Sequence, residues 1–383
     1  MIYLDNSATT KIDEEVLSAM LPWFRDDFGN ASSVYAIGRK ARVAIESARE
    51  EIAGLICAHP AEILFTSGGT ESNNTVLKSC VHDSGFVKRI VHTAIEHHAI
   101  LHPAEELARA GTEVVSVPVN EQGYVDCAMI RASATHWNTR TTLISVMHGN
   151  NEIGTIQPLT EIRSILPEAY IHTDAVQTFG KIPFDVQSLG VDFATLSAHK
   201  IHGPKGIGAL FIRKGIDFKA HQQGGAQERN RRGGTEAVAL IVGMQVAARR
   251  AYQEMQQRTE HMIQCTELLR TLLSESIPQL RINTPTDHAL PHIVNVSFCD
   301  AEHLDGEALL AQMDMRGIAV SNGSACVSGS LQPSHVLEAL GLSVSEAKAG
   351  VRFSVSKDTT TEEVRAGVFA LAEVIADMRT VSS

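Results

Sequence analysis

The sequence predicts an α/β protein with two domains, a large one built on a mostly parallel sheet and a smaller α+β one. Three observations lead to this prediction. Short β-branched runs alternate with amphipathic or turn-bounded segments from about residue 60 to 213, as in βαβ units whose sheet is covered on both faces. A stretch without Gly or Pro follows at residues 244–277. Beyond it, strand and helix patterns alternate again over shorter distances.

Seven runs in the first part have the β-branched content and the flanking turn residues of strands. They are residues 63–66, 89–93, 113–117, 142–147, 170–174, 192–197 and 208–213. Helical spacing lies between several of them, for example at 103–110, where Ala104, Leu107 and Ala108 share a face. Ligands of such sheets bind at the carboxyl ends of the strands, so the residues just after strands are the candidates for chemistry.

The stretch at 244–277 predicts one long helix that leaves the large domain. In the smaller domain we predict strands at 292–298, 318–321 and 351–355, and helices at 305–315, 334–340 and 362–378. The sequence shows neither an internal repeat nor a low-complexity linker, which indicates that the domains pack firmly together. We assign residues 15–258 to the large domain, and residues 1–14 plus 259–383 to the small one.

Composition indicates an ordinary globular protein. The 383 residues include 33 Lys plus Arg and 44 Asp plus Glu, a net charge of −11, and 44% are hydrophobic. No apolar run approaches the roughly 18 residues of a membrane span, and the N-terminus lacks the pattern of a signal peptide. We therefore expect a cytoplasmic protein without a membrane partner and without direct nucleic-acid binding, since no Lys/Arg block is present.

Six cysteines are spread along the chain without a C-x-x-C pair, which predicts neither a zinc site nor a disulfide framework. They are Cys57, Cys80, Cys127, Cys265, Cys299 and Cys326. For any one of them, the ordinary interpretation is a small buried hydrophobic side chain.

Two charged residues end neighbouring predicted strands. Lys200 follows the strand at 192–197 and precedes a Gly/Pro turn, a setting that can desolvate an amine for Schiff-base chemistry, although most lysines are solvated surface charges. Asp174 ends the strand at 170–174, where a carboxylate either caps a helix or pairs with a cation such as a pyridinium nitrogen. Gln177 could reach the phenolic oxygen of the same ring. The pair of Asp174 and Lys200, each at the end of a strand of one sheet, favours pyridoxal 5′-phosphate as the cofactor.

A candidate phosphate cradle lies at residues 65–74, where a strand, a Gly-Gly turn and a helix start follow one another. Backbone amides and the Thr70 hydroxyl would converge there on an anion, although a tight turn with a Thr cap explains the pattern as well. Ser197 and His199 could add donors. The stretch is neither a Walker loop nor a dinucleotide fingerprint, which disfavours NTP or NAD.

Histidines also follow strands, and they raise the question of a metal site. His92, His97, His98 and His102 lie close together in the sequence. They do not form a His-Glu-x-x-His pattern, and no third ligand recurs at a fixed spacing, so we predict no metal.

Eight stretches stand in the order found in cysteine desulfurases, and on these the chain resembles that family throughout its length. They are residues 3–10, 66–74, 96–97, 150–154, 174–177, 197–208, 232–235 and 323–326. The family belongs to the class V aminotransferase group of fold-type I pyridoxal-phosphate enzymes. The resemblance therefore implies this fold, this cofactor and L-cysteine as substrate.

The resemblance implies roles for individual residues. Lys200 matches the lysine that holds the cofactor covalently, and His97 matches the histidine that stacks on the ring and assists proton transfer. Asp174 and Gln177 match the partners of the ring nitrogen and the phenolic oxygen. The remaining matches are phosphate ligands and substrate-carboxylate ligands: Gly69, Thr70, Ser197, His199 and, from the neighbouring subunit of a homodimer, Thr235 for the phosphate, and Asn151 and Arg352 for the carboxylate.

Cys326 lies in a stretch of small residues, 321–330, with two Gly and four Ser. The ordinary interpretation is a turn with an idle thiol. The resemblance instead implies the catalytic cysteine, which takes sulfur from the substrate as a persulfide. The stretch continues through 332–334 without a deletion, so it resembles the long loop of the housekeeping type of the family.

Three alternatives to a desulfurase are an aminotransferase, a selenocysteine-specific lyase and a non-catalytic sulfur-transfer scaffold. Cys326 and its long loop argue against the first two, and the complete set of matched positions argues against the third. The sulfur acceptor stays open. An iron-sulfur scaffold, a tRNA thiolation enzyme, a cofactor-biosynthesis enzyme or a DNA phosphorothioation partner would each suit such an enzyme.

Overall fold

A computed structural model describes residues 1–134, 136–323 and 332–381 of the chain. Its centre is a seven-stranded sheet with the strand order β2-β8-β7-β6-β5-β3-β4. The strands are β2 Ile63–Thr66, β3 Arg89–Thr93, β4 Glu113–Val117, β5 Thr142–Ser145, β6 Tyr170–Asp174, β7 Phe193–Ser197 and β8 Gly208–Ile212. Strand β8 runs antiparallel to both of its neighbours, and the other pairs in this sheet are parallel. The prediction of a mostly parallel seven-stranded sheet is confirmed.

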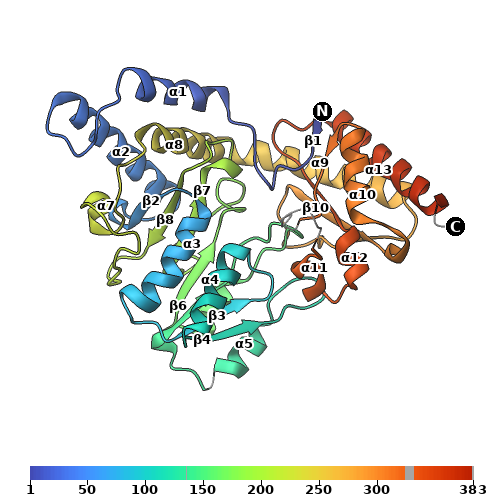
Figure 1. The fold of residues 1–383 in the computed structure, drawn as a ribbon, viewed down its shortest axis with the longest axis horizontal. Coiled ribbons are helices and arrows are strands. Elements are labelled where there is room, and N and C mark those ends of the chain that lie inside the picture. Colours follow the sequence, from blue (N-terminus) through green and yellow to red (C-terminus); the bar gives the residue numbers. More distant parts are fainter. Residues whose placement is uncertain (135, 324–331, 382–383) are drawn as a thin grey trace.

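Both faces of this sheet are apolar. Successive strand residues point to opposite sides, and in these strands the residues on both sides are hydrophobic. Ile63, Phe65 and Phe211 pack into one core cluster, together with α1 Glu14–Arg25, α2 Ala36–Leu55 and α8 Val238–Gln253. Leu64 and Leu210 pack into a second cluster on the other face, with α3 Gly69–Lys78 and α4 His98–Arg109. Helices thus cover both faces (Figure 1), and the strand ends are left to form a site.

The rest of the chain forms a separate apolar cluster around a three-stranded antiparallel sheet. Its strands are β9 Leu280–Ile282, β10 Ile293–Phe298 and β12 Val351–Ser354. Around it lie α9 Met255–Ser276, α10 Gly306–Met315, α11 His335–Ala339, α12 Val344–Ala349 and α13 Thr361–Val381, on the right of Figure 1.

The N-terminus belongs spatially to this second part. Strand β1 Ile2–Tyr3 pairs in parallel with β11 Ile318–Ala319, and Leu4 is buried in the same cluster as residues from 262 to 375. This arrangement supports our division into domains 15–258 and 1–14 plus 259–383, which we keep as a proposal.

The prediction of one continuous helix at 244–277 is wrong, because the helix is interrupted. The chain forms two helices, α8 and α9, which are separated at Glu254 (φ −99°, ψ 7°). The two carboxylate oxygens of Glu254 accept hydrogen bonds from Arg250 at 3.0 Å and from Arg258 at 2.7 Å. These ion pairs hold the break, which no Gly or Pro marks in the sequence.

Two further short helices, α5 Cys127–Ala134 and α6 Leu159–Ile165, add residues to the apolar cluster on one face of the large sheet. In the part of the chain that the structure describes, no helix combines the length and the apolar character that crossing a membrane requires.

Candidate active site

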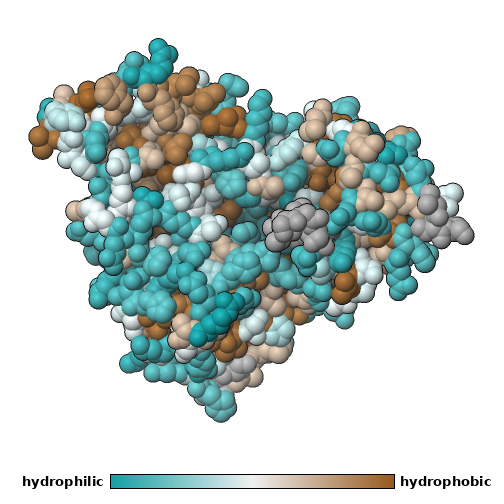
Figure 2. Space-filling view, viewed as in Figure 1, coloured by the Kyte–Doolittle hydropathy of each residue, from teal (hydrophilic) through white to brown (hydrophobic). Residues whose placement is uncertain are grey.

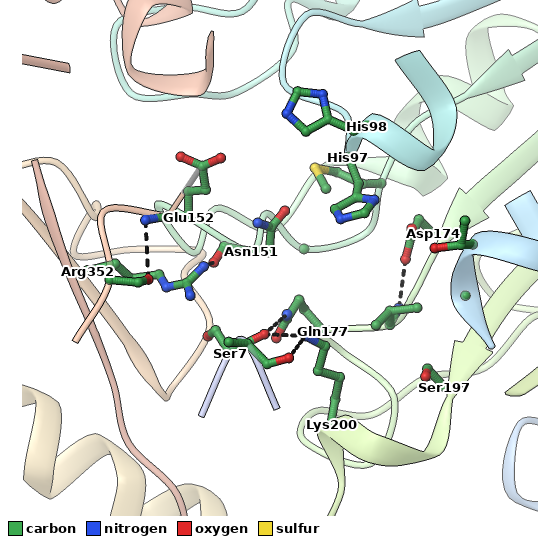
Figure 3. A pocket seen from close by; sticks show the side chains of 18 of the residues that line it. Ser7, His97, His98, Asn151, Glu152, Asp174, Gln177, Ser197, Lys200 and Arg352 are labelled. Atoms are coloured by element: carbon green, nitrogen blue, oxygen red, sulfur yellow. Dashed lines mark hydrogen bonds between the residues drawn. The ribbon is translucent and has the colours of Figure 1, made fainter. Parts of the chain in front are cut away.

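A cavity of about 450 Å³ opens at the carboxyl ends of β6 and β7, beside the start of α3 and the second part of the chain. Figure 3 shows it from close by. Of the residues for which sequence analysis predicted a role in catalysis or binding, ten line this cavity: Gly69, Thr70, His97, Asn151, Asp174, Gln177, Ser197, His199, Lys200 and Arg352. Residues that are up to 283 positions apart in the chain thus share one space, and the roles predicted for them can be compared with their geometry.

Lys200 extends into the cavity from the turn that follows β7. Its Nζ donates hydrogen bonds to the backbone carbonyl of Ser7 and, at 2.6 Å, to that of Ala8. Burial, and then the positive charge of Arg352, lower the pKa of Lys200 to about 8. An amine with such a pKa is partly uncharged near neutral pH, as a nucleophile or base must be.

Asp174 is the last residue of β6, and its side chain is held on both sides. Its Oδ2 accepts a hydrogen bond from Asn73 Nδ2 at 2.7 Å, and its Oδ1 accepts one from the backbone N–H of Val176 at 2.9 Å. Asp174 is buried. A buried and oriented carboxylate of this kind suits a cationic ring N–H.

Gln177 lies between the loop that follows β6 and the N-terminal segment. Its Nε2 donates to the carbonyl of Ser7 at 2.9 Å, and the same carbonyl accepts a hydrogen bond from Lys200. Figure 3 shows the side chains of Gln177 and Lys200 converging on Ser7. Gln177 therefore presents an amide N–H at the same end of the cavity as the Lys200 amine.

The phosphate cradle predicted around Thr70 lies at the start of α3, which has ten residues. A neighbouring cavity of about 330 Å³ is lined by Gly69, Thr70, Ser197 and His199, among others. A Cβ at Gly69 would lie 2.9 Å from Val176 Cγ2, so only glycine fits there without displacing a neighbour. The first-turn amides and two hydroxyl groups are thus grouped where an anion would bind.

His199 completes this group as an uncharged imidazole. Burial, and then the charge of Lys200, lower its pKa to about 4. Its Nδ1 lies 3.2 Å from Thr9 Oγ1. A neutral ring with one fixed nitrogen can donate a hydrogen bond to an anion from the other.

His97 caps the N-terminus of α4. Its Nδ1 accepts a hydrogen bond from the backbone N–H of Ala99 at 3.0 Å, which places the ring proton on Nε2. Burial among protein atoms lowers its pKa, although the ring itself faces the open cavity. The preceding loop is fixed by Glu96, whose Oε1 accepts a hydrogen bond from Met147 N at 2.8 Å.

Arg352 extends from β12 into the opposite wall of the cavity. It donates to Asp5 Oδ1 at 2.6 Å and to the backbone carbonyl of Asn151 at 2.8 Å. Its buried Nε has no hydrogen-bond partner among the residues that the structure describes. Part of the guanidinium is thus still available, as recognition of a substrate carboxylate would require.

Asn150, buried behind Asn151, shapes the loop that presents this wall. Its Oδ1 accepts from the backbone N–H groups of Glu152 and Ile153, at 2.8 and 2.9 Å, and its Nδ2 donates to the carbonyl of Ile95. The loop that carries Asn151 is therefore tied to the loop that precedes His97.

Glu152 is a buried cavity residue to which sequence analysis gave no role. Ser334 Oγ donates to its Oε2 at 2.5 Å, and a Cβ at Gly323 would lie 2.7 Å from the same oxygen. Glu152 therefore lies beside residues on both sides of 324–331. Cys326 itself lies outside the described residues.

Thr235 does not line the cavity of its own chain, and it is exposed. Its segment is linked to the cradle by Arg232, which pairs with Glu71 at 2.9 Å, next to Thr70. The sequence prediction placed Thr235 in the site of a second subunit, so its own-chain position leaves that prediction untested.

Sequence analysis missed Asp5, Ser7 and Asn73, which bond to Arg352, Lys200 and Asp174. Asp5 and Ser7 lie in the stretch 3–10, and Asn73 lies in the stretch 66–74. Both stretches were recognised as motifs, but their chemical partners are 101 or more positions away in the chain. Only the folded chain reveals these pairs.

Among the described residues, one group of three, Asp13, His202 and Asp358, has donor atoms close enough to share a metal ion. Asp13, however, already pairs with Lys357 Nζ at 3.0 Å and lies 3.7 Å from Arg258. These cations supply the charge that a metal would bring, so the group forms a network of ion pairs.

The donor set of the main cavity fits pyridoxal 5′-phosphate. The cavity offers an amine of lowered pKa, a buried carboxylate, an amide N–H and a cradle at a helix start that has no room for a Cβ. These are the groups that an aldehyde, a pyridine nitrogen, a phenolic oxygen and a phosphate require.

Comparisons with known proteins agree on one family. The chain matches the family described as Aminotransferase class-V over residues 2–366. It is similar to a protein of Dictyoglomus turgidum named cysteine desulfurase IscS, with 43% identity over 384 residues that cover 100% of this chain and 96% of the relative.

Two solved structures share the fold. A NifS-like protein superposes with a TM-score of 0.90 at 36% identity, over 98% of this chain and 99% of that one. A protein described as SspA in complex with cysteine superposes with a TM-score of 0.81 at 34% identity, over 94% of this chain and 100% of the other.

Proposed function

Because this chain belongs to the class-V aminotransferase family and is a cysteine desulfurase, we propose that it transfers the sulfur of L-cysteine to the thiol of Cys326. The observation that carries the proposal is the single cavity in which Lys200, Asp174 and Arg352 meet. The complex of SspA with cysteine, a structure of the same fold, supports this choice of substrate.

The proposed reaction balances without an added oxidant or reductant. L-Cysteine and the Cys326 thiol give L-alanine and a Cys326 persulfide. The Cβ–S bond of the substrate is replaced by a C–H bond, and the S–H bond of Cys326 is replaced by an S–S bond. The persulfide then passes to an acceptor.

Arg352 and Asn151 would bind the substrate carboxylate. The Arg352 guanidinium is fixed by Asp5 and by the carbonyl of Asn151, so it is already oriented before the substrate arrives. A planar guanidinium binds a carboxylate through two parallel hydrogen bonds. Such a contact would orient the substrate Cα toward Lys200.

Pyridoxal 5′-phosphate, held by Lys200, Asp174, Gln177 and the cradle around Thr70, would supply an electron-withdrawing ring that stabilises negative charge at the substrate Cα. Lys200, with a pKa of about 8, is suited to take a proton from that carbon and to return one. His97, with its proton on Nε2, is suited to hand a proton to a group in the cavity.

Cys326 is assigned from its sequence context alone. Its neighbours Gly323 and Ser334 lie next to Glu152, which lines the cavity. The described residues Gly323 and Ser334, on either side of 324–331, thus lie beside the proposed site, which supports a thiol that reacts there.

We extend the proposal to a homodimer. The surface over α1 and α2 is apolar in Figure 2, with Phe28 71% and Val34 84% exposed. This surface adjoins the segment of Thr235, because Arg42 of α2 pairs with Glu236 at 2.7 Å. Burying it against a second copy would place Thr235 near the subunit interface, as its predicted role at the partner's phosphate requires.

The acceptor would be a protein such as an iron-sulfur scaffold, or an enzyme of tRNA or DNA thiolation. We place the reaction in the cytoplasm. The proposals on the acceptor and on the compartment do not rest on the geometry of the cavity. A mixed disulfide trapped between Cys326 and its partner would identify the acceptor.

The test is a pair of variants. Cys326→Ala should keep the visible absorbance of the bound cofactor but form neither persulfide nor alanine from L-cysteine. Lys200→Ala should lose the covalent attachment, so that borohydride no longer fixes the cofactor to the chain. Mass spectrometry of the protein and an alanine assay measure both results.

Cys299→Ala is the matched control, because Cys299 is an exposed thiol that lies outside the cavity. It should turn over L-cysteine like the unmodified protein. Alanine formation by Cys326→Ala at the normal rate would refute the assignment of Cys326.

A further inference from the structure

Lys181 is a buried lysine that does not line the main cavity. It follows β6 in the same loop as Gln177, and only 7% of it is exposed. Among the described residues, no carboxylate bonds to its amine, whose partners are Gln177 Oε1 at 3.3 Å and His292 Nε2 at 3.0 Å. A lysine in such a place is costly to bury, so its chemistry needs an explanation.

His292, which precedes β10, is also fully buried. Its Nε2 lies 3.2 Å from Gln177 Oε1 as well as 3.0 Å from Lys181 Nζ. The three side chains therefore form a closed triangle in which each contacts the other two. The triangle joins the large sheet to the second part of the chain.

The charges around this triangle are positive. Burial is the main reason that the pKa of Lys181 and that of His292 lie well below their ordinary values, and the charges of Lys200 and Arg352 act on both in the same direction. Arg258 and Lys357 line a small neighbouring cavity together with Lys181. This setting favours the uncharged forms of both groups, an amine at Lys181 and an imidazole at His292.

An uncharged amine has two N–H groups and a lone pair. It can donate to Gln177 Oε1 and still pair with His292 Nε2, whichever of the two carries the proton. With its oxygen held on this side, the amide of Gln177 must direct its Nε2 to the other side, where it now donates to the Ser7 carbonyl at 2.9 Å. The orientation of the amide is thus set by Lys181 and His292 together with Ser7.

We propose that Lys181, with His292, is a positioning residue that fixes the amide of Gln177 so that its N–H faces the phenolic oxygen of the cofactor. This inference rests on the proposed function, because it needs pyridoxal 5′-phosphate next to Gln177. It adds a residue outside the cavity lining, which acts through Gln177 and adds no charge to the site.

The experiment compares Lys181→Met, which keeps the stem and removes the donor, with Lys181→Gln, which keeps an uncharged donor. The pH titration of the visible absorbance band and the dissociation constant of the cofactor are measured on the full protein. In Lys181→Met we expect the midpoint of the pH titration of this band to differ by about one pH unit from that of the unmodified protein. The dissociation constant of the cofactor should rise about tenfold, as the loss of one hydrogen bond to a charged oxygen predicts.

Lys181→Gln should remain within about threefold in the dissociation constant, because Gln177 Oε1 keeps a donor. Lys88→Met, at an exposed lysine, is the control and should match the unmodified protein. Unchanged titration and affinity in Lys181→Met would overturn the inference. If that variant does not fold, a tenfold loss of affinity in Lys181→Gln would overturn it instead.

Thermal unfolding of the cofactor-free variants separates positioning from a merely structural role. A positioning role leaves their midpoints close to that of the unmodified protein, because each variant keeps a side chain of similar volume and Lys181 has no ion pair to lose among the described residues. A fall in the unfolding midpoint that is large enough to account for the weaker binding of the cofactor would overturn the inference. Absence of the cofactor from the unmodified protein would refute the proposed function first, and this inference with it.

Discussion

At the scale of single residues, the site depends on groups whose charge is suppressed by burial. Lys200, His97 and His199 all have pKa values below their ordinary range, and burial is the main cause in each case. The neutral forms can act as nucleophile, proton donor and hydrogen-bond donor without repelling one another. The cavity thus collects basic groups but few positive charges.

The lowered pKa of Lys200 can be tested through the reaction of its amine with added cofactor. Only the uncharged amine attacks an aldehyde, so the rate of covalent attachment should rise tenfold per pH unit at low pH and level off near the Lys200 pKa of about 8. A lysine with the ordinary pKa of about 10.4 would continue to rise. The growth of the visible band in cofactor-free protein measures the rate.

Arg352→Gln is the informative comparison. The charge of Arg352 lowers the pKa of Lys200, so its removal should move the levelling point to higher pH. A rate that still rises beyond pH 9 in the unmodified protein would contradict the lowered pKa.

Sequence reasoning found the residues that end strands, but not the residues that hold them. Lys200 and Asp174 were predictable because each follows an apolar strand at the edge where ligands of parallel sheets bind. Asn73 and Lys181 were not predictable. The sequence around an Asn in a helix or a Lys in a loop looks the same whether the side chain is buried or exposed to solvent. Their roles come from contacts with Asp174 and Gln177 in the folded chain.

At the scale of elements, one buried ion pair holds an irregular segment against the large sheet. The short helix α7 Gln227–Asn230 contains Glu228, Arg229 and Asn230 at φ values of 45°, 59° and 63°, which are unfavourable for residues with a Cβ. Glu228 is anchored by Arg49 of α2 through two hydrogen bonds, at 2.8 and 2.9 Å.

The surroundings of this pair explain why it can stabilise the strain. The side chains of Arg49 and Glu228 are each only 2% exposed. Arg49 also donates to the carbonyl of Ile63, and Glu228 accepts a hydrogen bond from the backbone N–H of Phe65. The pair therefore connects α2, β2 and the segment that leads to Thr235.

We predict that Arg49→Met lowers the free energy of unfolding by about 3–5 kcal/mol, because it leaves the buried Glu228 carboxylate without its cationic partner. The double variant Arg49→Met/Glu228→Gln should recover a large part of this loss, since no unpaired charge remains. Urea unfolding of the single and double variants measures both effects.

Arg140→Met is the matched control, because Arg140 pairs with Glu168 at 2.6 Å on the surface, where its side chain is 76% exposed. Its loss should cost less than about 1 kcal/mol. If Arg49→Met loses no more stability than this control, the buried pair does not hold the segment.

Elements were predictable where the local pattern is strong. The strands at 63–66, 89–93, 113–117 and 170–174 have the bounds that the structure gives them, because β-branched runs there end at turn residues or charges. The break at Glu254 was missed because Arg250 and Arg258 are good helix formers and signal nothing locally. The helices α1 and α2 were not predicted either, although their apolar residues pack into the large core.

At the scale of the whole molecule, burial of histidines couples folding to pH. Among the described residues, eight histidines have a lowered pKa, and five of them, His98, His148, His172, His199 and His202, are lowered to about 3 or 4. The unfolded chain protonates these rings near pH 6.5, but the folded chain does not. Stability is therefore lost as pH falls below about 6.5.

Two buried glutamates act in the opposite direction. Burial raises the pKa of Glu96 to about 8, and it also raises that of Glu152. The folded chain holds these protons while the unfolded chain, at an ordinary pKa of about 4.3, releases them, so their contribution to stability grows as pH falls. The histidines outnumber them, and the net effect in the window from about pH 6.5 to 4.5 is destabilising.

His172 allows this balance to be tested at one position. It is fully buried within the large sheet, between Ser145 Oγ at 2.9 Å and Thr195 Oγ1 at 3.1 Å, and burial lowers its pKa to about 3. His172→Asn replaces the ring with an amide that does not titrate. Relative to the unmodified protein, the variant should gain about 2 kcal/mol between pH 8 and pH 5, because one proton fewer binds on unfolding over about 1.5 pH units. Urea unfolding across this range measures the difference, with the exposed His136→Asn as control; parallel curves for all three proteins would show that His172 takes up its proton in the folded state.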